Sequence, residues 1–304
     1  MSVTDDQRKM IYTLNSVVSG VSLSGCCFIL LMFVSFKDLR SSGFKLILVL
    51  GIIDILNCIC FMIPTYNSSN GDLECQVQAA LLNFSSISGI LWTTIIAWSL
   101  KRVIVGTNTS IHGFINKSII GTFILSIGFT LIPWLLNYYG TTAGWCWIKL
   151  SKKNLDGIFL RTFLFFVPLV LSIAVNFYFY MKIKKALKSM IVNYEQKAIN
   201  KQLCKKLTLY PLILIICYFP YVIKQIIELT SINQEYYEYS FTIAIGILRS
   251  GHGLLNCFIY GFTGKVREKI KNVLRNFKIL KGEASKISLE TLHSLSSVDE
   301  VNSN

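Results

Sequence analysis

Long uncharged runs dominate the hydrophobic pattern of the chain. One of them begins at Cys75, continues for 26 residues to Leu100 without a charged side chain, and is followed by Lys101 and Arg102. An α-helix rises about 1.5 Å per residue, so about 20 residues cross the hydrocarbon core of a bilayer. This stretch is therefore predicted to be a membrane-spanning helix.

Small residues recur every four positions within this stretch, at Ser85, Gly89, Thr93 and Ala97. A ridge with so little side-chain bulk lets neighbouring helices approach closely, and helix association in lipid depends on such packing. We therefore expect this helix to lie at the centre of a bundle. The alternative is an ordinary span in which the small residues are incidental.

Six more apolar stretches have membrane-spanning length. They cover residues 11–36, 46–63, 118–138, 158–181, 207–227 and 240–262, which makes seven spans in all. Hydrophobic residues make up 53% of the chain, charged residues only 15%, and the mean hydropathy is +0.53. These values do not fit a soluble domain. The predicted fold class is an all-α integral membrane protein, a seven-transmembrane helix bundle.

The distribution of Lys and Arg predicts the orientation. The N-terminal tail and the loops at 64–74, 139–157 and 228–239 hold 5, whereas the loops at 37–45, 101–117 and 182–206 and the tail from 263 hold 22. Positive residues mark the cytoplasmic side, so the N-terminus is predicted outside and the C-terminus inside. The net charge of +14 then reflects contact with anionic lipid rather than nucleic acid.

The chain is predicted to have four parts. These are an extracellular N-tail at 1–10, the seven-transmembrane domain at 11–262, an amphipathic juxtamembrane helix at 263–280 and a disordered cytoplasmic tail at 281–304. The tail lacks apolar bulk, so no packed core is expected there. Its candidate phosphorylation sites are Ser285, Ser288, Thr291, Ser294, Ser296 and Ser297.

Two modifications are expected on the outer side. Of nine cysteines, only Cys75 and Cys146 fall in outer segments, where oxidation is favoured. We predict a disulfide between them, which joins the third span to the loop after the fourth. Asn67, followed by Ser68 and Ser69 in the first outer loop, is a candidate for N-glycosylation.

Charged residues inside the spans are few. Asp54 lies in the middle of the second span, where a charge is costly and is usually retained for a site, an ion or a partner. A buried acid hydrogen-bonded to polar neighbours is the alternative. Arg249 lies deep in the seventh span, where its side chain cannot easily extend to the headgroups.

Arg161 and Lys224 lie near the outer ends of the fifth and sixth spans. Two roles fit them: extension to the headgroup level, or lining a pocket that is open to the outside. A guanidinium grips a phosphate or carboxylate through two parallel hydrogen bonds, and an aromatic wall suits a flat ligand face. The candidates for binding an anionic ligand are Arg161, Lys224, Lys149, Trp147 and Arg249.

Pro211 and Pro220 lie nine residues apart in the sixth span. Each proline removes a backbone N–H and tends to kink a helix, so this span is a candidate hinge for opening an inner cleft. Proline is, however, also simply tolerated in membrane helices. With two buried polar residues added, the switch candidates are Asp54, Asn256, Pro211 and Pro220.

Motifs for catalysis are absent from the sequence. It has no phosphate-binding loop, no HExxH zinc motif and no glycine pattern for a dinucleotide, and its three histidines are scattered. The sequence predicts that the protein is not an enzyme and has no cofactor or metal site.

Four local strings resemble one receptor family. They are Cys75-Gln76-Val77-Gln78 leading to Leu91-Trp92-Thr93, Gly144-Trp145-Cys146-Trp147-Ile148, Leu209-Tyr210-Pro211-Leu212 with Cys217-Tyr218-Phe219-Pro220, and Gly253-Leu254-Leu255-Asn256 with Tyr260-Gly261. Together they resemble the slime mold cyclic AMP receptor family of G-protein-coupled receptors, which shares features with secretin-type receptors. The sequence departs from the rhodopsin pattern, because no acid-arginine-aromatic triplet ends the third span.

The resemblance implies a cell-surface receptor that passes the binding of an extracellular ligand to a heterotrimeric G protein. It implies cyclic AMP only weakly, so a cyclic nucleotide is one candidate among anionic ligands. The cations that would face an acidic G-protein surface are Lys101, Arg102, Lys182, Lys184, Lys185, Lys205 and Lys206, although contact with anionic lipid also explains them.

A seven-span transporter or channel that uses Asp54 and Arg249 inside the membrane is the alternative function. Transporters usually contain internal repeats, and the two halves of this sequence show none. A retinal-binding pump would need a lysine in the seventh span, and residues 240–262 contain none. The receptor interpretation is therefore favoured.

Epitope tags test the predicted orientation. Because the loop charges divide 22 to 5, a tag before Met1 should be accessible to antibody on intact cells, and a tag after Asn304 only after permeabilisation. Accessibility of both tags on intact cells would contradict the seven-span topology.

Overall fold

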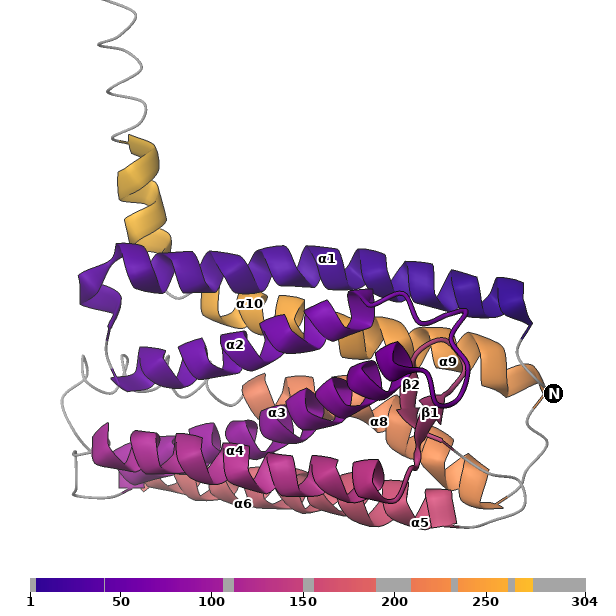
Figure 1. The fold of residues 1–304 in the computed structure, drawn as a ribbon. Helices are drawn as coiled ribbons and strands as arrows, with labels where there is room; N and C mark the ends of the chain where they lie inside the picture. Colours follow the sequence, from indigo (N-terminus) through magenta and orange to yellow (C-terminus); the bar gives the residue numbers. More distant parts are fainter. Residues whose placement is uncertain are drawn as a thin grey trace, which may run out of the picture. The chain divides into compact units, whose positions relative to one another are not determined.

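The computed structural model describes residues 4–40, 42–105, 112–149, 156–189, 209–230, 235–261 and 266–275. The chain divides into two units, Met1–Tyr260 and Gly261–Asn304. The first unit is a helix bundle closed at one end by a two-stranded hairpin (Figure 1). In the second unit, residues 266–275 are helical, within the range predicted for the amphipathic helix.

The helices agree with the predicted class of fold. The α-helices of the bundle are α1 (Asp5–Ser35), α2 (Ser42–Met62), α3 (Leu73–Val105), α4 (His112–Leu135), α5 (Asp156–Arg161), α6 (Val167–Ser189), α8 (Leu209–Thr230), α9 (Glu235–Ser250) and α10 (His252–Gly261). A 3₁₀ turn, η1 (Lys37–Leu39), follows α1, and a π-helical turn, η2 (Thr162–Phe166), joins α5 to α6. Among the described residues, five helices are long and apolar enough to cross a membrane, and the number is six if the bent α9–α10 pair is counted as one span. With 22 residues, α8 has the length of a further span.

The first helix starts earlier than predicted. We expected the span to begin at residue 11 after a ten-residue tail, but α1 begins at Asp5. The Thr4 hydroxyl accepts a hydrogen bond from the Gln7 N–H, and the Gln7 side chain accepts one from the Thr4 N–H. This capping box fixes the start of the helix. Acidic residues in the first turn also interact favourably with the positive end of the helix dipole.

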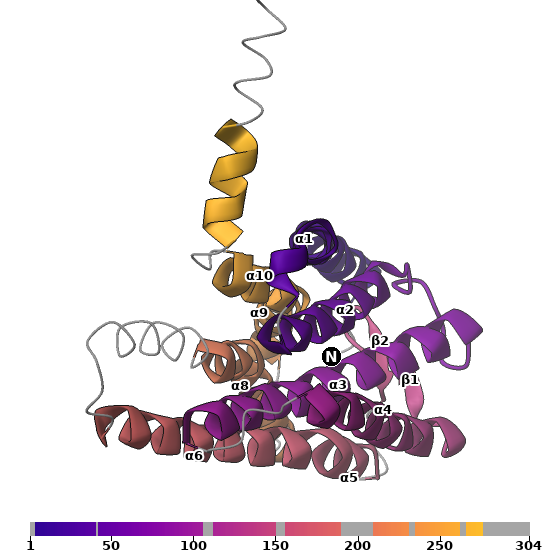
Figure 2. The same cartoon turned by 90° about the vertical axis from the view of Figure 1, so that its left-hand side faces the viewer.

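Helix α3 occupies the centre of the bundle, as predicted. It contacts α2, α4, α6 and α8 as well as both strands (Figures 1 and 2). In its most apolar 18-residue window 72% of the residues are buried, against 17–50% in the other four candidate spans. The small-residue ridge, Ser85, Gly89, Thr93 and Ala97, is buried along its whole length. The ridge therefore serves close helix packing.

The hairpin lies between α4 and α5 and was not anticipated from the sequence. Strands β1 (Tyr139–Thr141) and β2 (Cys146–Ile148) are antiparallel, with Gly140 opposite Trp147. The predicted disulfide is present, because Cys146 in β2 is bonded to Cys75 in the first turn of α3. We call this the hairpin end of the bundle.

Gln78 joins three elements beneath the disulfide. Its Oε1 accepts hydrogen bonds from the Cys146 N–H (2.7 Å) and the Thr65 hydroxyl (2.6 Å). Its Nε2 donates to the carbonyls of Cys60 (2.9 Å) and Ile63 (3.2 Å) at the end of α2. Both ends of this amide are hydrogen-bonded, and together the bonds fix β2 and α2 to α3. Trp147, which follows Cys146, is thereby held over the bundle interior.

The sharp bend lies in the seventh span rather than in the sixth. Helices α9 and α10 meet at Gly251 at an angle of 43°. A Cβ atom at Gly251 would lie 2.9 Å from the Ile247 carbonyl oxygen, so a side chain would not fit there without a shift. In contrast, α8 is assigned as one continuous helix through Pro220. The side chain of Pro211 lies outside the described part, and a hinge role for either proline stays a prediction.

Loss of the disulfide should destabilise the hairpin end. Cys75→Ser or Cys146→Ser should each lower the free energy of unfolding by about 2–5 kcal/mol, and the double variant should be little worse because only one bond is lost. Thermal unfolding of the purified protein measures this, with Cys27→Ser, a free thiol, as the control. Additive losses in the double variant would contradict the pairing.

Candidate functional site

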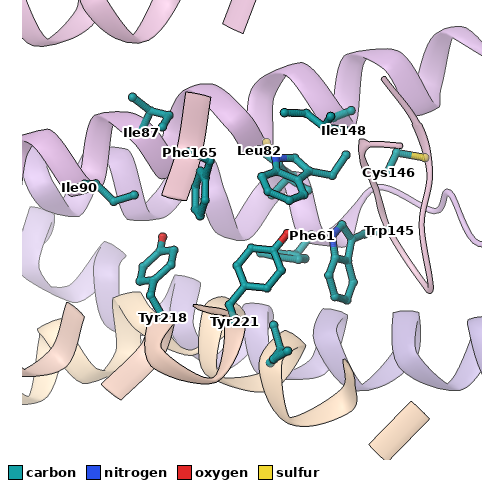
Figure 3. Packing of buried hydrophobic residues seen from close by; sticks show 14 of the residues in the cluster. Phe61, Leu82, Ile87, Ile90, Trp145, Cys146, Ile148, Phe165, Tyr218 and Tyr221 are labelled. Carbon is teal, nitrogen blue, oxygen red and sulfur yellow. The ribbon is translucent and has the colours of Figure 1, made fainter. Parts of the chain in front are cut away.

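Five aromatic rings gather below the hairpin. Phe61 comes from α2, Trp147 from β2, Phe165 from η2, and Tyr218 and Tyr221 from α8, and all five are buried. The Trp147 ring centroid lies 5.1 Å from that of Phe165 and 5.3 Å from that of Tyr221. Figure 3 shows Phe61, Phe165, Tyr218 and Tyr221 directed towards one another, with both tyrosines on α8. We call these five residues the aromatic cage.

Arg249 places its guanidinium within the aromatic cage. Its Cζ lies 5.0–5.9 Å from all five ring centroids, within the range of cation–π attraction. Nη2 donates a 2.8 Å hydrogen bond to the Ser86 hydroxyl, whereas Nε and Nη1 are buried without a hydrogen-bond partner. The residue is 3% exposed, and among the described residues no salt bridge joins it to an acid.

The backbone break supports this buried charge. Arg249 occupies the last turn of α9, which ends before Gly251. The carbonyl end of a helix carries a partial negative charge that stabilises a nearby cation. The break therefore stabilises the guanidinium within a span, although it supplies no full counter-charge.

Hydrogen bonds hold Trp147 in place above the guanidinium. The Trp147 indole N–H donates to Asn83 Oδ1 (3.1 Å), and the Asn83 amide donates to the Phe129 carbonyl (3.2 Å). At the edge of the hairpin, the Tyr138 hydroxyl donates to an Asp156 carboxylate oxygen (2.9 Å), and this hydrogen bond raises the pKa of the Tyr138 phenol. The hairpin is thus tied to α3, α4 and α5.

The π-helical turn η2 directs several side chains to the same interior. A π turn is wider than an α turn, and such turns are frequent at functional sites. Arg161, just before η2, and Phe165 and Phe166 within it are all buried, whereas Phe163 is 61% exposed. The wide turn thereby supplies Phe165 to the aromatic cage, and Arg161 lies directly before it.

Arg161 and Lys224 meet at an acid that we did not single out in the sequence. Arg161 Nη1 lies 3.4 Å and Lys224 Nζ 3.9 Å from carboxylate oxygens of Glu228. Arg161 is 5% exposed and its Cζ lies 4.9 Å from the Trp147 ring centroid, so it points inward rather than to the headgroups. Glu228 lies one helical turn after Lys224, and this i, i+4 spacing could have predicted their ion pair from the sequence.

A second polar cluster lies beyond the bend. Asp54 Oδ1 lies 2.9 Å from His252 Nδ1, and the Asn256 amide donates to Asp54 Oδ2 (2.8 Å). The backbone N–H of Leu254 donates to the Ser22 hydroxyl (2.9 Å). Of the two roles open for Asp54, the structure has the hydrogen-bonded buried acid, and a switch role for Asp54 and Asn256 stays a prediction.

Short polar side chains lie between the two clusters. Ser86 accepts from Arg249, and the Asn57 amide donates to the Ser85 hydroxyl (3.1 Å) and, more weakly, to Ser86 (3.5 Å). Asn57 follows Asp54 by three residues on α2, so the two lie on neighbouring turns of one helix face. Polar contacts thus extend from the aromatic cage towards the acid below the bend.

The remaining predicted residues lie outside the cage. Lys149 follows β2 and is half-buried beside Gly140. On the predicted inner side, Lys101 lies over the Phe179 ring at 5.6 Å. Arg102 lies 5.3 Å from the centroid of Trp98, Lys182 contacts the Tyr178 ring, and Lys184 and Lys185 are exposed. Asn67 is exposed, and its glycosylation stays a prediction. Outside the described part lie Lys205, Lys206, Ser285, Ser288, Thr291, Ser294, Ser296 and Ser297.

Comparison with known proteins gives consistent matches. The sequence profile described as slime mold cyclic AMP receptor matches residues 2–280. G-protein coupled receptor 1 of Arabidopsis thaliana is 28% identical over 285 residues, which cover 90% of this chain and 85% of that protein. Cyclic AMP receptor-like protein A of Dictyostelium discoideum is 23% identical over 261 residues, 84% of this chain and 66% of that protein. Ascaroside receptor GPR2 of Arthrobotrys oligospora is 29% identical over 183 residues, 56% of this chain and 44% of that protein.

The packing below the bend can be tested at Gly253. A Cβ atom there would lie 2.6 Å from Cys26 Sγ and 2.9 Å from Ser22 Oγ. Gly253→Ala should therefore lower the free energy of unfolding by about 1–3 kcal/mol, measured by thermal unfolding. Adding Cys26→Ala should recover part of this loss, and Gly121→Ala, with nothing within 4 Å, should be nearly neutral. A fully stable Gly253→Ala variant would contradict the close packing.

Proposed function

The chain belongs to the slime mold cyclic AMP receptor family, and from this premise we propose that its extracellular ligand is anionic and binds Arg249. The protein is a multi-pass membrane receptor of the cyclic AMP receptor-like, G-protein-coupled class. Its partners are an extracellular ligand and a G protein. The role we propose is recognition and signalling rather than catalysis.

Two guanidinium nitrogens of Arg249, Nε and Nη1, have no hydrogen-bond partner and carry this proposal. A buried guanidinium is costly unless it is paired, and its described partners are aromatic faces and one hydroxyl. A carboxylate or phosphate oxygen is the acceptor that suits such donors, and a charge-assisted hydrogen bond is stronger than a neutral one. An anionic ligand would therefore supply the charge that the protein itself does not place there.

The cage also favours a ligand with a flat or apolar part. Trp147 and Tyr221 present large rings beside the guanidinium, and aromatic faces pack well against other planar groups. Two of the relatives are named for cyclic AMP and for ascarosides. A cyclic nucleotide, with one phosphodiester charge and a planar base, is thus a reasonable first compound to test.

The predicted inner face offers cations to the G protein. Arg102 lies over the rings of Trp98 and Phe114, at 5.3 and 5.7 Å, and Lys101 over Phe179. Side chains fixed on aromatic faces lose less conformational freedom when an acidic surface binds them. We propose that Lys101, Arg102, Lys182, Lys184, Lys185, Lys205 and Lys206 contribute to this surface.

The anion site is tested by removing the charge of Arg249. Membranes that carry the full chain and a G protein are screened for activation by cyclic AMP and by small carboxylates, phosphates and neutral analogues. Arg249→Gln should raise the half-maximal concentration of an anionic activator about 10- to 100-fold, because a charge-assisted hydrogen bond contributes about 1.5–3 kcal/mol. Surface expression should be unchanged.

Matched variants complete the test. Arg249→Lys should fall between wild type and Arg249→Gln, because lysine keeps the charge but not the planar pair of donors. Lys9→Gln removes an exposed cation from the first helix and controls for general attraction of anions. An effective activator that is neutral or cationic, or a normal response of Arg249→Gln to an anion, would rule out the proposal.

A further inference from the structure

Glu228, near the end of α8, is the shared partner of two cations. Its Oε2 lies 3.4 Å from Arg161 Nη1 and its Oε1 lies 3.9 Å from Lys224 Nζ. Both cations therefore share one carboxylate. The three side chains are at most 15% exposed, so salt and water screen their charges weakly.

Neutral partners fix the same two cations. The Arg161 Nε donates a 2.6 Å hydrogen bond to the Ile148 carbonyl of β2, and Lys224 Nζ donates a 2.7 Å hydrogen bond to the Thr242 hydroxyl of α9. Arg161 and Lys224 are therefore committed to the carboxylate, to β2 and to α9. Arg249, in contrast, has two nitrogens, Nε and Nη1, without a hydrogen-bond partner.

The Glu228 cluster and the aromatic cage form a continuous region. Trp147 is shared, because the Cζ of Arg161 lies 4.9 Å and the Cζ of Arg249 lies 5.7 Å from its ring centroid. Glu228 thus adds a negative charge beside the place where a ligand's anionic group would lie. Without that carboxylate, three cations would face the ligand with no acidic counter-charge from this cluster.

Resting on the proposed function, we propose that Glu228 sets the charge selectivity of the site. Its carboxylate keeps Arg161 and Lys224 from the ligand and lowers the positive potential around Arg249. The site then favours a ligand with one negative charge, such as a carboxylate, a sulfate ester or a phosphodiester, over a dianion such as a phosphate monoester. The electrostatic energy between Glu228 and a ligand is proportional to the ligand's charge. Neutralising Glu228 should therefore lower the dissociation constant of a dianion by the square of the factor by which it lowers that of a monoanion.

Sulfate and methyl sulfate are matched probes with two and one negative charges. The full chain is purified into nanodiscs of neutral phosphatidylcholine, and the dissociation constant of each anion follows from its concentration-dependent rise in Tm. With Glu228→Gln the constant should fall about 3-fold for methyl sulfate and about 10-fold for sulfate. Glu74→Gln, which neutralises an exposed acid in the first turn of α3, should leave the ratio unchanged.

Further variants separate charge from structure. Glu228→Met, of similar volume, is a second neutral variant with the same expected shift if Glu228→Gln folds poorly. Glu228→Gln combined with Lys224→Gln removes one charge of each sign, so the ratio should return towards wild type. An equal change in both dissociation constants, as expected from a purely structural role, would overturn the inference.

The proposed function fails in a different way. If sulfate and methyl sulfate stabilise wild type no more than they stabilise Arg249→Gln, the anion site at Arg249 itself is wrong. If both anions bind through Arg249 but neutralising Glu228 leaves their ratio unchanged, only the selectivity role is wrong.

Discussion

A buried guanidinium without a carboxylate is the constraint on which the hairpin end depends. A charge removed from water needs compensation, and around Arg249 this comes from ring faces, the Ser86 hydroxyl and the carbonyl end of α9. Each contribution comes from a different element. The disulfide and Gln78 position β2 and hence Trp147, while the π turn positions Phe165. The tertiary structure of this end is thus what makes the charge tolerable.

The sequence pattern predicted those features that depend on neighbouring residues or on the side of the membrane. Span lengths, the central ridge and the partner of Cys75 follow from composition, spacing and compartment. The position of the bend was missed, because α9 and α10 meet at Gly251, whereas a kink was expected at the prolines of the sixth span. The cage was missed because Arg249 meets Ser86 across 163 residues, and no sequence period fixes which helix faces meet. The contact between Lys224 and Glu228 could have been predicted from the sequence, because the two residues lie one helical turn apart.

Asp54 and Arg249, the two polar centres in the bundle, differ in how far the protein satisfies their hydrogen-bonding groups. Both carboxylate oxygens of Asp54 have partners, His252 and Asn256, so the hydrogen-bonding capacity of this second polar cluster is satisfied within the protein. Arg249 uses one of its three nitrogens in a hydrogen bond and leaves the other two without one. A satisfied network favours one packing of the helices, whereas an unsatisfied buried cation favours binding of something that supplies the missing acceptor. If Arg249 binds the ligand as proposed, structural and recognition roles are separated along the bundle.

The bend joins these two centres. Arg249 and His252 lie three residues apart on opposite sides of Gly251, and polar contacts through Ser86 and Asn57 extend in parallel on α3 and α2. A ligand that neutralises Arg249 changes the interaction between this residue and the end of α9, which the guanidinium now stabilises. Only a ligand whose binding energy differs between two bend geometries can shift the equilibrium between them. The charge and the break lie within one helical turn of each other, so an anion bound to Arg249 as proposed would act directly on the bent span.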